Sequence, residues 1–296
     1  MFPPTLLTIL AVMAAFGIWI FFVEPNWFRL RRVSVRLKKP LESPLSILHL
    51  SDFHCTKHRY FLDRFFDRLS KLEVDFVFVT GDLIDEPEGI PHCVTQLQKL
   101  KPKKGIYAVL GNHDYCEYAP FDRTTLLPLG YPVIRERGEV EELKRALKEA
   151  GVEVLLNQNV SLRLNDRQEM VLIGIDDPVT EKADLERAFH GIQNGALHLA
   201  LVHSPMIFPK LGGRDIDITF SGHTHGGQIR LPGIGALPPV YRLEPIVDST
   251  SQYGFIGLVS RGMGAQPLTH PRLFCRPETL LVNIQGSSEK DSVEIN

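Results

Sequence analysis

Residues 75–85 read Asp-Phe-Val-Phe-Val-Thr-Gly-Asp-Leu-Ile-Asp, an apolar run that ends in a glycine and two nearby carboxylates. Two other stretches have the same form, Leu-Ser-Ile-Leu-His-Leu-Ser-Asp-Phe-His over 45–54 and Ile-Tyr-Ala-Val-Leu-Gly-Asn-His-Asp over 106–114. Each apolar run has the length and composition of a buried strand. The three stretches therefore predict three strands, each followed at once by side chains with oxygen or nitrogen donors.

Helical periodicity lies between these strands. Residues 60–72 place six apolar side chains at helical spacing, and residues 90–101 suit a second helix. A rhythm of strand, helix and strand, in units of about 30 residues, favours βαβ connections and a parallel sheet. Consecutive parallel strands bring their carboxyl ends to one edge of the sheet, where ligands bind. The donors expected to converge there are Asp52, His54, Asp82, Asn112 and His113.

The second half of the chain has a less regular pattern. It predicts an irregular stretch over 117–137, helices over 139–150 and 181–190, and strands over 152–156, 160–164, 170–175 and 197–203. From Ile216 onward, short apolar runs alternate with Gly and Pro, which predicts a second, more antiparallel sheet. Residues 286–296 are polar, and we expect them to be disordered.

Three histidines in the late chain add further donors. His203 ends the apolar run over 197–203, and Ser-Gly-His-Thr-His-Gly-Gly over 221–227 contains His223 and His225. Two histidines at positions i and i+2 between glycines are not typical of core packing, and the glycines permit turns that project the imidazoles outward. A single strand-end histidine is often structural, but five such segments in one order argue against coincidence.

In this order, Asp-x-His, Gly-Asp, Gly-Asn-His-Asp, a later strand-end His and Gly-His-x-His resemble the calcineurin-like metallophosphoesterases. The resemblance covers about residues 45–285. It implies an α/β fold, a four-layer α-β-β-α sandwich of two mixed sheets. It also implies one metal held by Asp52, His54, Asp82 and His225, and a second held by Asp82, Asn112, His203 and His223, with Asp82 as the bridge. His113 would lie near the scissile phosphate, and Asp85 would orient it.

The chemistry of the donors is consistent with two divalent cations. A carboxylate between two mixed nitrogen and oxygen ligand sets can bridge such a pair. A ligand set without thiolates suits Mn²⁺, Fe or Zn²⁺, of which we expect Mn²⁺ first. The four cysteines form no Cys-x-x-Cys pair, which favours a reducing compartment. For contacts to substrate phosphates, the candidates are Arg261, Arg272, His58 and Arg59.

An apolar segment opens the sequence. Residues 1–23 contain no charged side chain, and Thr5–Val23 is long enough, at ~1.5 Å per residue, to cross the ~30 Å hydrocarbon core of a bilayer. A cleaved signal peptide is the alternative, but no Lys or Arg precedes the apolar run and no small-residue cleavage site follows it. We expect an uncleaved single-pass anchor in the inner (cytoplasmic) membrane.

Charge is distributed unevenly along the chain. Residues 24–40 hold six basic side chains and one acidic one, and the remainder carries 27 basic and 34 acidic side chains. Basic residues only after the apolar segment place the catalytic domain in the cytoplasm, by the positive-inside rule. An acidic domain is a poor nucleic-acid binder, because phosphate contacts need clustered Lys and Arg. We therefore expect no nucleic-acid partner, and a nuclease is disfavoured.

The sequence divides into an anchor over 1–24, a basic juxtamembrane linker over 25–44, a metallophosphoesterase domain over 45–285 and a disordered tail over 286–296. The anchor, Glu-Pro-Asn over 24–26 and the Gly-His-Thr-His-Gly-Gly-Gln-Ile-Arg-Leu-Pro segment also resemble the membrane-anchored bacterial branch of the family. That branch includes UDP-2,3-diacylglucosamine pyrophosphatases of lipid A synthesis and related phosphodiesterases.

The leading interpretation is a phosphodiester or pyrophosphate hydrolase that acts on a membrane lipid or a nucleotide-linked lipid. The alternatives are a phosphodiesterase of broad or other specificity, and a membrane-bound metal-binding scaffold without turnover. No protein partner can be named from the sequence. Phe61, Phe65 and Phe66 follow the first donor segment, and an exposed subset of them would form a rim for acyl chains.

Overall fold

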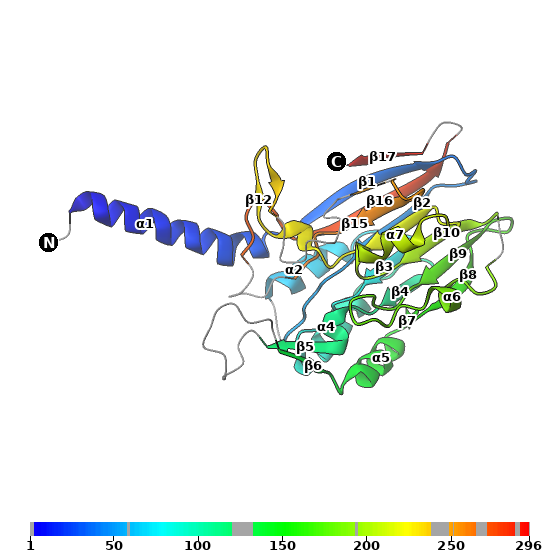
Figure 1. The fold of residues 1–296 in the computed structure, drawn as a ribbon, viewed down its shortest axis with the longest axis horizontal. Coiled ribbons are helices and arrows are strands. Elements are labelled where there is room, and N and C mark those ends of the chain that lie inside the picture. The colour runs from blue at the N-terminus through cyan, green and yellow to red at the C-terminus, as the bar shows by residue number, and fades with distance from the viewer. Residues whose placement is uncertain are drawn as a thin grey trace.

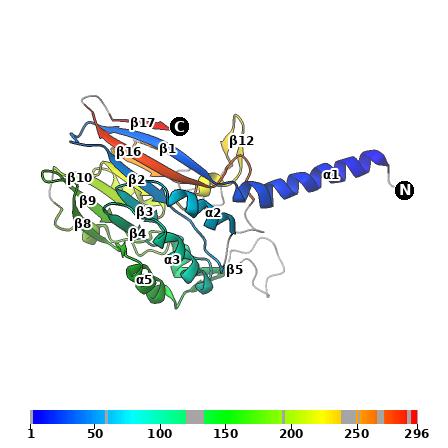
Figure 2. The ribbon, with the colours of Figure 1, turned by 180° about the vertical axis from the view of Figure 1, so that it is seen from behind.

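The computed structural model describes residues 3–57, 60–119, 133–192, 195–237, 249–250, 252–264, 271–287 and 291–295. Two β-sheets lie face to face, with helices on both outer sides and one long helix projecting from the domain (Figure 1). The sandwich has four layers, α-β-β-α, as predicted. Figure 2 shows the same layers from behind, with the apolar helix α1 again extending away from the sheets.

The first sheet has seven strands in the order β17-β1-β16-β2-β3-β4-β7. These are β17 (Ser292–Ile295), β1 (Arg29–Leu37), β16 (Glu278–Gly286), β2 (Leu45–Leu50), β3 (Phe76–Thr80), β4 (Gly105–Val109) and β7 (Val152–Val154). The pairs β2–β3, β3–β4 and β4–β7 are parallel, whereas β16 runs antiparallel to β2. The parallel central strands match the βαβ rhythm of the sequence.

The second sheet has six strands in the order β14-β15-β11-β10-β9-β8. These are β14 (Ser249–Thr250), β15 (Ile256–Val259), β11 (Ile218–Ser221), β10 (Leu197–Leu201), β9 (Glu169–Gly174) and β8 (Gln158–Arg163). Two short hairpins complete the strands, β5 (Cys116–Ala119) with β6 (Val133–Glu136), and β12 (Arg230–Leu231) with β13 (Gly235–Ala236).

The helices cover the two outer faces. Those against the first sheet are α2 (Tyr60–Leu69), α3 (Ile90–Gln98) and α5 (Val140–Glu149), and those against the second are α6 (Leu185–Ala188) and α7 (Phe208–Leu211). Short helical turns are α4 (Asn112–Tyr115), η3 (Pro87–Gly89), η4 (Pro205–Ile207) and η5 (His225–Gly227). The N-terminal helix α1 (Pro4–Ile18) continues through η1 (Trp19–Val23) and η2 (Glu24–Asn26).

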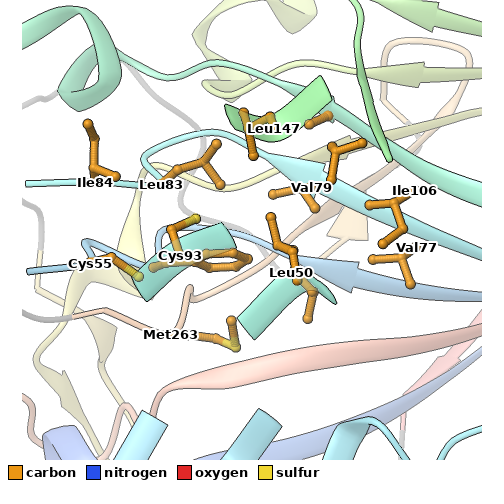
Figure 3. Close-up of a cluster of buried hydrophobic side chains, with 14 of the residues drawn as sticks. Leu50, Cys55, Val77, Val79, Leu83, Ile84, Cys93, Ile106, Leu147 and Met263 are labelled. Atoms are coloured by element: carbon orange, nitrogen blue, oxygen red, sulfur yellow. The ribbon is translucent and has the colours of Figure 1, made fainter. Parts of the chain in front are cut away.

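Side-chain alternation along β3 explains why this strand is apolar throughout. Val77 and Val79 pack against the outer helices, together with Leu50 and Leu147 (Figure 3). Phe76 and Phe78 point the other way and join the core between the two sheets, so the strand is covered on both faces. A parallel strand that is buried on both faces is expected to be a continuous apolar run.

The apolar N-terminal segment is helical over Pro4–Asn26, with a mean hydropathy of 2.6, and its most apolar window is not buried inside the protein. Because this length and composition suffice to cross a bilayer, the segment fits the predicted anchor. Among the residues that the structure describes, one helix is long and apolar enough to span a membrane, and it is this one.

Two stretches assigned from the sequence to a linker and to a disordered tail contain strands instead. Within 25–44, β1 pairs with β16 in parallel, and within 286–296, β17 pairs with β1. The missed signal is the alternation in β1, where Val33, Val35 and Leu37 are buried between more polar neighbours. Four of the six basic residues of this stretch, Arg29, Arg31, Arg32 and Arg36, therefore lie on a folded strand, and Lys38 and Lys39 follow its end.

The expectation of a more antiparallel second sheet holds only for its edge pairs β14–β15 and β8–β9, and it is wrong for the central strands. In this sheet β10 pairs in parallel with both β9 and β11, and β11 pairs in parallel with β15. The long strand β16 joins the first sheet, where its apolar residues fill the core between the sheets. The stretch over 117–137 contains the β5–β6 hairpin, and residues 120–132 lie outside the described residues.

Candidate metal centre and active site

The predicted metal ligands lie in loops that directly follow strand ends, and their backbone is unusual. Five of them have positive φ angles, although none is a glycine: Asp52 (53°), His54 (48°), Asp82 (52°), His223 (67°) and His225 (48°). Side-chain-bearing residues rarely adopt this conformation, which costs of order 1–3 kcal/mol each and is concentrated at functional sites. The fold therefore holds these side chains in place at a cost in backbone energy.

Backbone hydrogen bonds align the first two loops. The N–H groups of Asp52 and His54 donate to the carbonyl oxygens of Gly81 and Asp82, each at 3.0 Å. The Asp114 carboxylate, fully buried, then connects the second loop to the third. It accepts hydrogen bonds from the N–H groups of Leu83 (2.8 Å), Ile84 (3.2 Å) and Gly111 (2.9 Å). In the sequence, Asp114 ends the third motif, and no local pattern indicates this role.

The glycines of the motifs allow the loops to approach one another closely. A Cβ atom on Gly222 would lie 1.9 Å from Ser51 Oγ and 2.3 Å from Asp52 Oδ2. A Cβ atom on Gly111 would lie 2.4 Å from Asp82 Oδ1. All three distances are far below van der Waals contact, so any side chain at these positions would displace a proposed ligand.

One group of ligand atoms comes from Asp52, His54 and His225. The Nε2 atoms of His54 and His225 lie 3.2 Å apart, and His225 Nε2 lies 3.5 Å from Asp52 Oδ1. His54 Nδ1 donates to Asp85 Oδ1 at 2.7 Å, so in the neutral ring Nε2 keeps its lone pair. Nitrogen and carboxylate oxygen atoms that converge in this way are suited to a divalent cation.

A second group comes from Asp82, His203 and His223. His203 Nε2 lies 3.1 Å from Asp82 Oδ2 and 3.0 Å from His223 Nδ1. His203 Nδ1 donates to the carbonyl oxygen of Thr80 at 2.7 Å, which again leaves Nε2 available as a ligand. The hydrogen bond to Thr80 thus sets the ring orientation that ligation needs.

Asp82 lies between these two groups. Its Oδ2 atom is 3.1 Å from His203 Nε2 and 3.7 Å from His54 Nε2, while its Oδ1 atom accepts the N–H of His113 at 2.8 Å. One carboxylate oxygen therefore faces a ring nitrogen from each group. This is the position in which a bridging carboxylate would contact two cations.

The Asn112 side chain supplies a test of whether a cation fits the second group. Its Nδ2 atom donates to the Tyr118 hydroxyl at 2.9 Å, which fixes the orientation of the amide. Its Oδ1 atom is buried and has no hydrogen-bond partner within the described part of the chain. A buried carbonyl oxygen without a partner costs free energy, and a cation would satisfy it. The residues present therefore fit a metal.

His113 and Asp85 lie beside the two groups. His113 Nδ1 donates to Asp85 Oδ1 at 2.9 Å, and the His113 ring stacks on Tyr118 at a centroid distance of 4.5 Å. Arg137, which no sequence motif marks as functional, donates from Nε to the His113 carbonyl at 2.8 Å and from Nη2 to the Asp85 carbonyl. His113 also forms a third potential ligand group with His54 and Asp82.

Without a metal, the electrostatics of the site favour ionised carboxylates beside protonated histidines. Burial alone would raise the pKa of Asp82, but His203, His113 and His54 outweigh it and hold this pKa well below its usual range. Burial alone would lower the pKa of His54, but Asp85, Asp82 and Asp52 outweigh it and raise the pKa to about 9. Divalent cations would replace these protons on the same nitrogen atoms, as is usual when histidine ligands bind metal.

Arg272, expected to bind substrate phosphates, has a structural role instead. It is fully buried, and its guanidinium donates to the carbonyl oxygens of Cys275 (2.9 Å), Arg261 (2.8 Å) and Gly264 (2.8 Å). Its Nη2 atom also lies 3.2 Å from His225 Nδ1. Arg261 is only partly exposed, with Nε 3.8 Å from Glu278 Oε1, and stays a candidate for substrate contact. His58 and Arg59 lie outside the described residues.

Comparison with known proteins identifies the family to which the chain belongs. The sequence family described as Calcineurin-like phosphoesterase matches residues 45–227. An uncharacterized metallophosphoesterase of Bacillus subtilis, YkoQ, is 34% identical over 65% of this chain, and the match spans 65% of YkoQ, just under two thirds.

Two relatives have more specific names. The UDP-2,3-diacylglucosamine pyrophosphatase LpxG of Chlamydia trachomatis is 27% identical over 77% of this chain and 78% of LpxG. The phosphodiesterase YaeI of Escherichia coli is 27% identical over 93% of this chain and 94% of YaeI. With a family match over more than half of its residues and the ligand groups described above, the chain belongs to the calcineurin-like phosphoesterase family.

Proposed function

We propose that this protein is a hydrolase that uses two divalent metal ions to cleave a phosphodiester or pyrophosphate bond at the cytoplasmic face of a membrane. The observation that carries the proposal is the position of Asp82 Oδ2, which faces His203 Nε2 at 3.1 Å and His54 Nε2 at 3.7 Å. Nitrogen and oxygen ligands on both sides of one buried carboxylate are the arrangement that a two-metal site requires.

The residues divide into two sets by task. The metal ligands we assign are Asp52, His54, Asp82 and His225 for one ion, and Asp82, Asn112, His203 and His223 for the other. When bound, two such ions polarise the phosphoryl group and stabilise the charge on its oxygens. His113 faces the same space with Nδ1 donating to Asp85, so its Nε2 atom is the one available to hydrogen-bond the substrate. When the ring carries a proton on both nitrogen atoms, Nε2 can give its proton to the leaving oxygen.

The ligand chemistry narrows the choice of metal to three ions. Imidazole, carboxylate and amide oxygen suit Mn²⁺, Fe or Zn²⁺, and the described residues place no thiolate in the ligand groups. We propose Mn²⁺ as the first ion to test. The buried cysteines contribute packing and hydrogen bonds, as Cys275 does when its Sγ atom donates to the His225 carbonyl at 3.3 Å.

For the substrate, we propose a lipid-linked or otherwise amphipathic phosphodiester, with the pyrophosphate linkage of UDP-2,3-diacylglucosamine as the leading candidate. The relative LpxG is named for this substrate, and the apolar helix keeps the site close to a bilayer, where a soluble substrate would gain little. The acidic balance of the domain disfavours a long polyanion such as DNA. Phe61 is 54% exposed, whereas Phe65 and Phe66 are buried in the core, so only Phe61 of the three remains available to an acyl chain.

A phosphodiesterase of other specificity is the second candidate. It is favoured by the match to the phosphodiesterase YaeI, which extends over 93% of this chain. A metal-binding scaffold without turnover has less support, because neither a proposed ligand nor His113 is missing from the site.

Turnover of three substrates by the full chain in detergent micelles, with added Mn²⁺, tests the proposal. The substrates are UDP-2,3-diacylglucosamine, bis-p-nitrophenyl phosphate and 3′,5′-cyclic AMP, and Asp82→Asn is the control for contaminating hydrolases. Metal-dependent cleavage of the acylated substrate at the highest kcat/KM supports the lipid proposal. Preference for a soluble substrate would keep the assignment as a hydrolase and reject the proposed lipid substrate. No turnover of any of the three, with two metals bound, supports the scaffold.

A further inference from the structure

The base of the apolar helix is hydrogen-bonded to the segment 272–276. The N–H of Arg272 donates to the carbonyl oxygen of Ile20 at 2.9 Å, and the N–H of Cys275 donates to Glu24 Oε1 at 2.7 Å. Glu24 is only 3% exposed, and its other oxygen accepts Trp19 Nε1 at 2.9 Å. A buried carboxylate with two specific donors fixes the position of the helix base against this segment.

The same segment supports the β12–β13 hairpin. The N–H of Arg230 donates to the Leu273 carbonyl at 2.8 Å, and the N–H of Leu273 donates to the Gln228 carbonyl at 3.0 Å. The hairpin begins five residues after the proposed ligand His225, and Figures 1 and 2 both show it beside the inner end of α1. The helix base, the segment 272–276 and the hairpin therefore form one connected unit next to the metal centre.

Exposed apolar side chains gather on this unit. Four of them, which we call the collar, are Ile234 (72% exposed), Phe274 (59%), Trp27 (47%) and Leu237 (38%). Of the seven large hydrophobic side chains that are exposed outside the apolar helix in the described residues, these four belong to the connected unit. Tyr60 and Phe61 lie on α2, and α2 reaches the helix base through the stacking of Phe65 on Phe28 at 5.0 Å. Only Met206 lies elsewhere.

The polar groups around the collar suit a bilayer interface. The Arg276 guanidinium lies 3.9 Å from the centre of the Trp27 ring, and Arg276 Nε donates to the Trp27 carbonyl at 2.9 Å. Trp and Tyr rings with adjacent Arg side chains are typical of the headgroup region, where one end of the side chain is apolar and the other is hydrated. An exposed apolar group of this kind on a soluble surface would otherwise favour aggregation.

We propose that the collar inserts into the headgroup region of the leaflet in which the apolar helix ends. The occupant is the bilayer itself, because the collar continues the exposed apolar surface of a helix with a mean hydropathy of 2.6. The insertion would hold the metal-site end of the sandwich against the membrane, so that the scissile phosphate of a lipid could reach the site without leaving the leaflet. This last consequence rests on the proposed function, whereas the insertion itself does not.

Spin labels on the full chain in vesicles of phosphatidylcholine and phosphatidylglycerol test the insertion. The labelled positions are Ile234→Cys and Phe274→Cys, and the control is Asp166→Cys in the β8–β9 turn, at the opposite end of the strands. The four native cysteines are buried, so they compete little for the label. We expect the collar labels to be accessible to dissolved oxygen and protected from a water-soluble nickel complex, and the control label to show the reverse.

Two outcomes would overturn the proposal. If the collar labels are as accessible to the nickel complex as the label at position 166, the collar lies in water. Dipolar broadening between collar labels that disappears on dilution with unlabelled protein would show a second copy of the chain on the collar.

A second measurement separates insertion from activity. In Ile234→Asp/Phe274→Asp, we expect turnover of a long-chain diacyl substrate in vesicles to fall about tenfold, because carboxylates resist transfer into the interface. Hydrolysis of bis-p-nitrophenyl phosphate should be unchanged. Equal turnover of the vesicle substrate by both proteins would contradict a role for the collar. Loss of the soluble activity as well would indicate damage to the fold.

Discussion

His54 and His113 hydrogen-bond to the same atom, Oδ1 of Asp85, at 2.7 and 2.9 Å. Because an ionised carboxylate only accepts, both rings must present a protonated Nδ1 to Asp85 and an Nε2 atom to the site. Burial would raise the pKa of Asp85, but the two histidines outweigh it and hold this pKa below its usual range. One carboxylate therefore orients both a proposed metal ligand and the proposed proton donor.

Replacing Asp85 by Ala should affect both histidines at once. We expect metal affinity to fall about 10–100-fold, the usual effect of removing the hydrogen-bond partner of a ligating histidine, with a further loss of turnover when metal is saturating. Metal titration monitored by calorimetry, together with kcat at saturating Mn²⁺, measures the two effects. Normal affinity in Asp85→Ala would show that Asp85 serves His113 alone.

His113→Ala provides the complementary case. We expect both metals to stay bound and turnover to fall roughly 10²–10⁴-fold, the range for a positioned acid or electrostatic stabiliser. Metal content by plasma mass spectrometry and kcat/KM for bis-p-nitrophenyl phosphate measure the result. Because His113 also lies in a potential ligand group with His54 and Asp82, loss of metal would identify it as a ligand.

Asp82→Asn should lower the metal content and nearly abolish turnover. The substitution keeps the shape of the side chain but removes the negative charge that faces His203 and His54. Asp166→Asn, on an exposed turn, is the matched control for loss of one carboxylate. Two metals per chain with normal turnover in Asp82→Asn would reject the bridging assignment.

Asp114→Ala should destabilise the fold more than it affects the chemistry directly. Three backbone N–H groups lose their buried acceptor, and each unsatisfied donor costs about 1–3 kcal/mol, with partial compensation by water. We expect the free energy of unfolding to fall by about 3 kcal/mol, measured by urea denaturation of the metal-free protein in detergent. Asp114→Asn, which keeps one acceptor oxygen, should lose less, and equal losses would contradict this explanation.

The parallel strands made much of this site predictable from the sequence. Because β2, β3 and β4 run side by side, Asp52, Asp82 and Asn112 had to meet at one edge, although 60 positions separate the first from the last. The supporting contacts were not predictable in the same way. Asp114 and Arg137 act through backbone groups of other loops, and no local pattern shows which carbonyl or N–H a side chain will reach.

Arg272 shows that the burial of a charged residue is hard to predict from the sequence. An arginine in a glycine-rich segment suggested an anion-binding group, yet its guanidinium is covered by carbonyl oxygens of residues 261, 264 and 275. In β1, the buried residues Val33, Val35 and Leu37 alternate with more polar ones, but the basic residues of the stretch made this strand pattern hard to recognise. In both cases the charge dominated the sequence pattern. Burial was decided by tertiary contacts, which are those with β16 for β1 and those with the carbonyl oxygens of residues 261 and 264 for Arg272.

The position of β1 between the apolar helix and the rest of the domain limits where a topology reporter can be placed. A reporter fused after residue 40 would cut between β1 and β2 and so remove β1 from its sheet. Cysteine labelling of the full chain avoids this problem, with Asp166→Cys as the exposed target and the buried native cysteines as background.

We expect Asp166→Cys to be protected from a membrane-impermeant maleimide in intact cells and to react after the cells are lysed. The reason is that six basic side chains lie within residues 24–40 and none lies in residues 1–23. The positive-inside rule acts on the nascent chain, so the later folding of Arg29–Leu37 into β1 does not weaken it. Reaction in intact cells, or a mature N-terminus near residue 24, would place the metal site on the other side of the membrane. That result would reject a cytoplasmic lipid substrate while leaving the metal ligands as assigned.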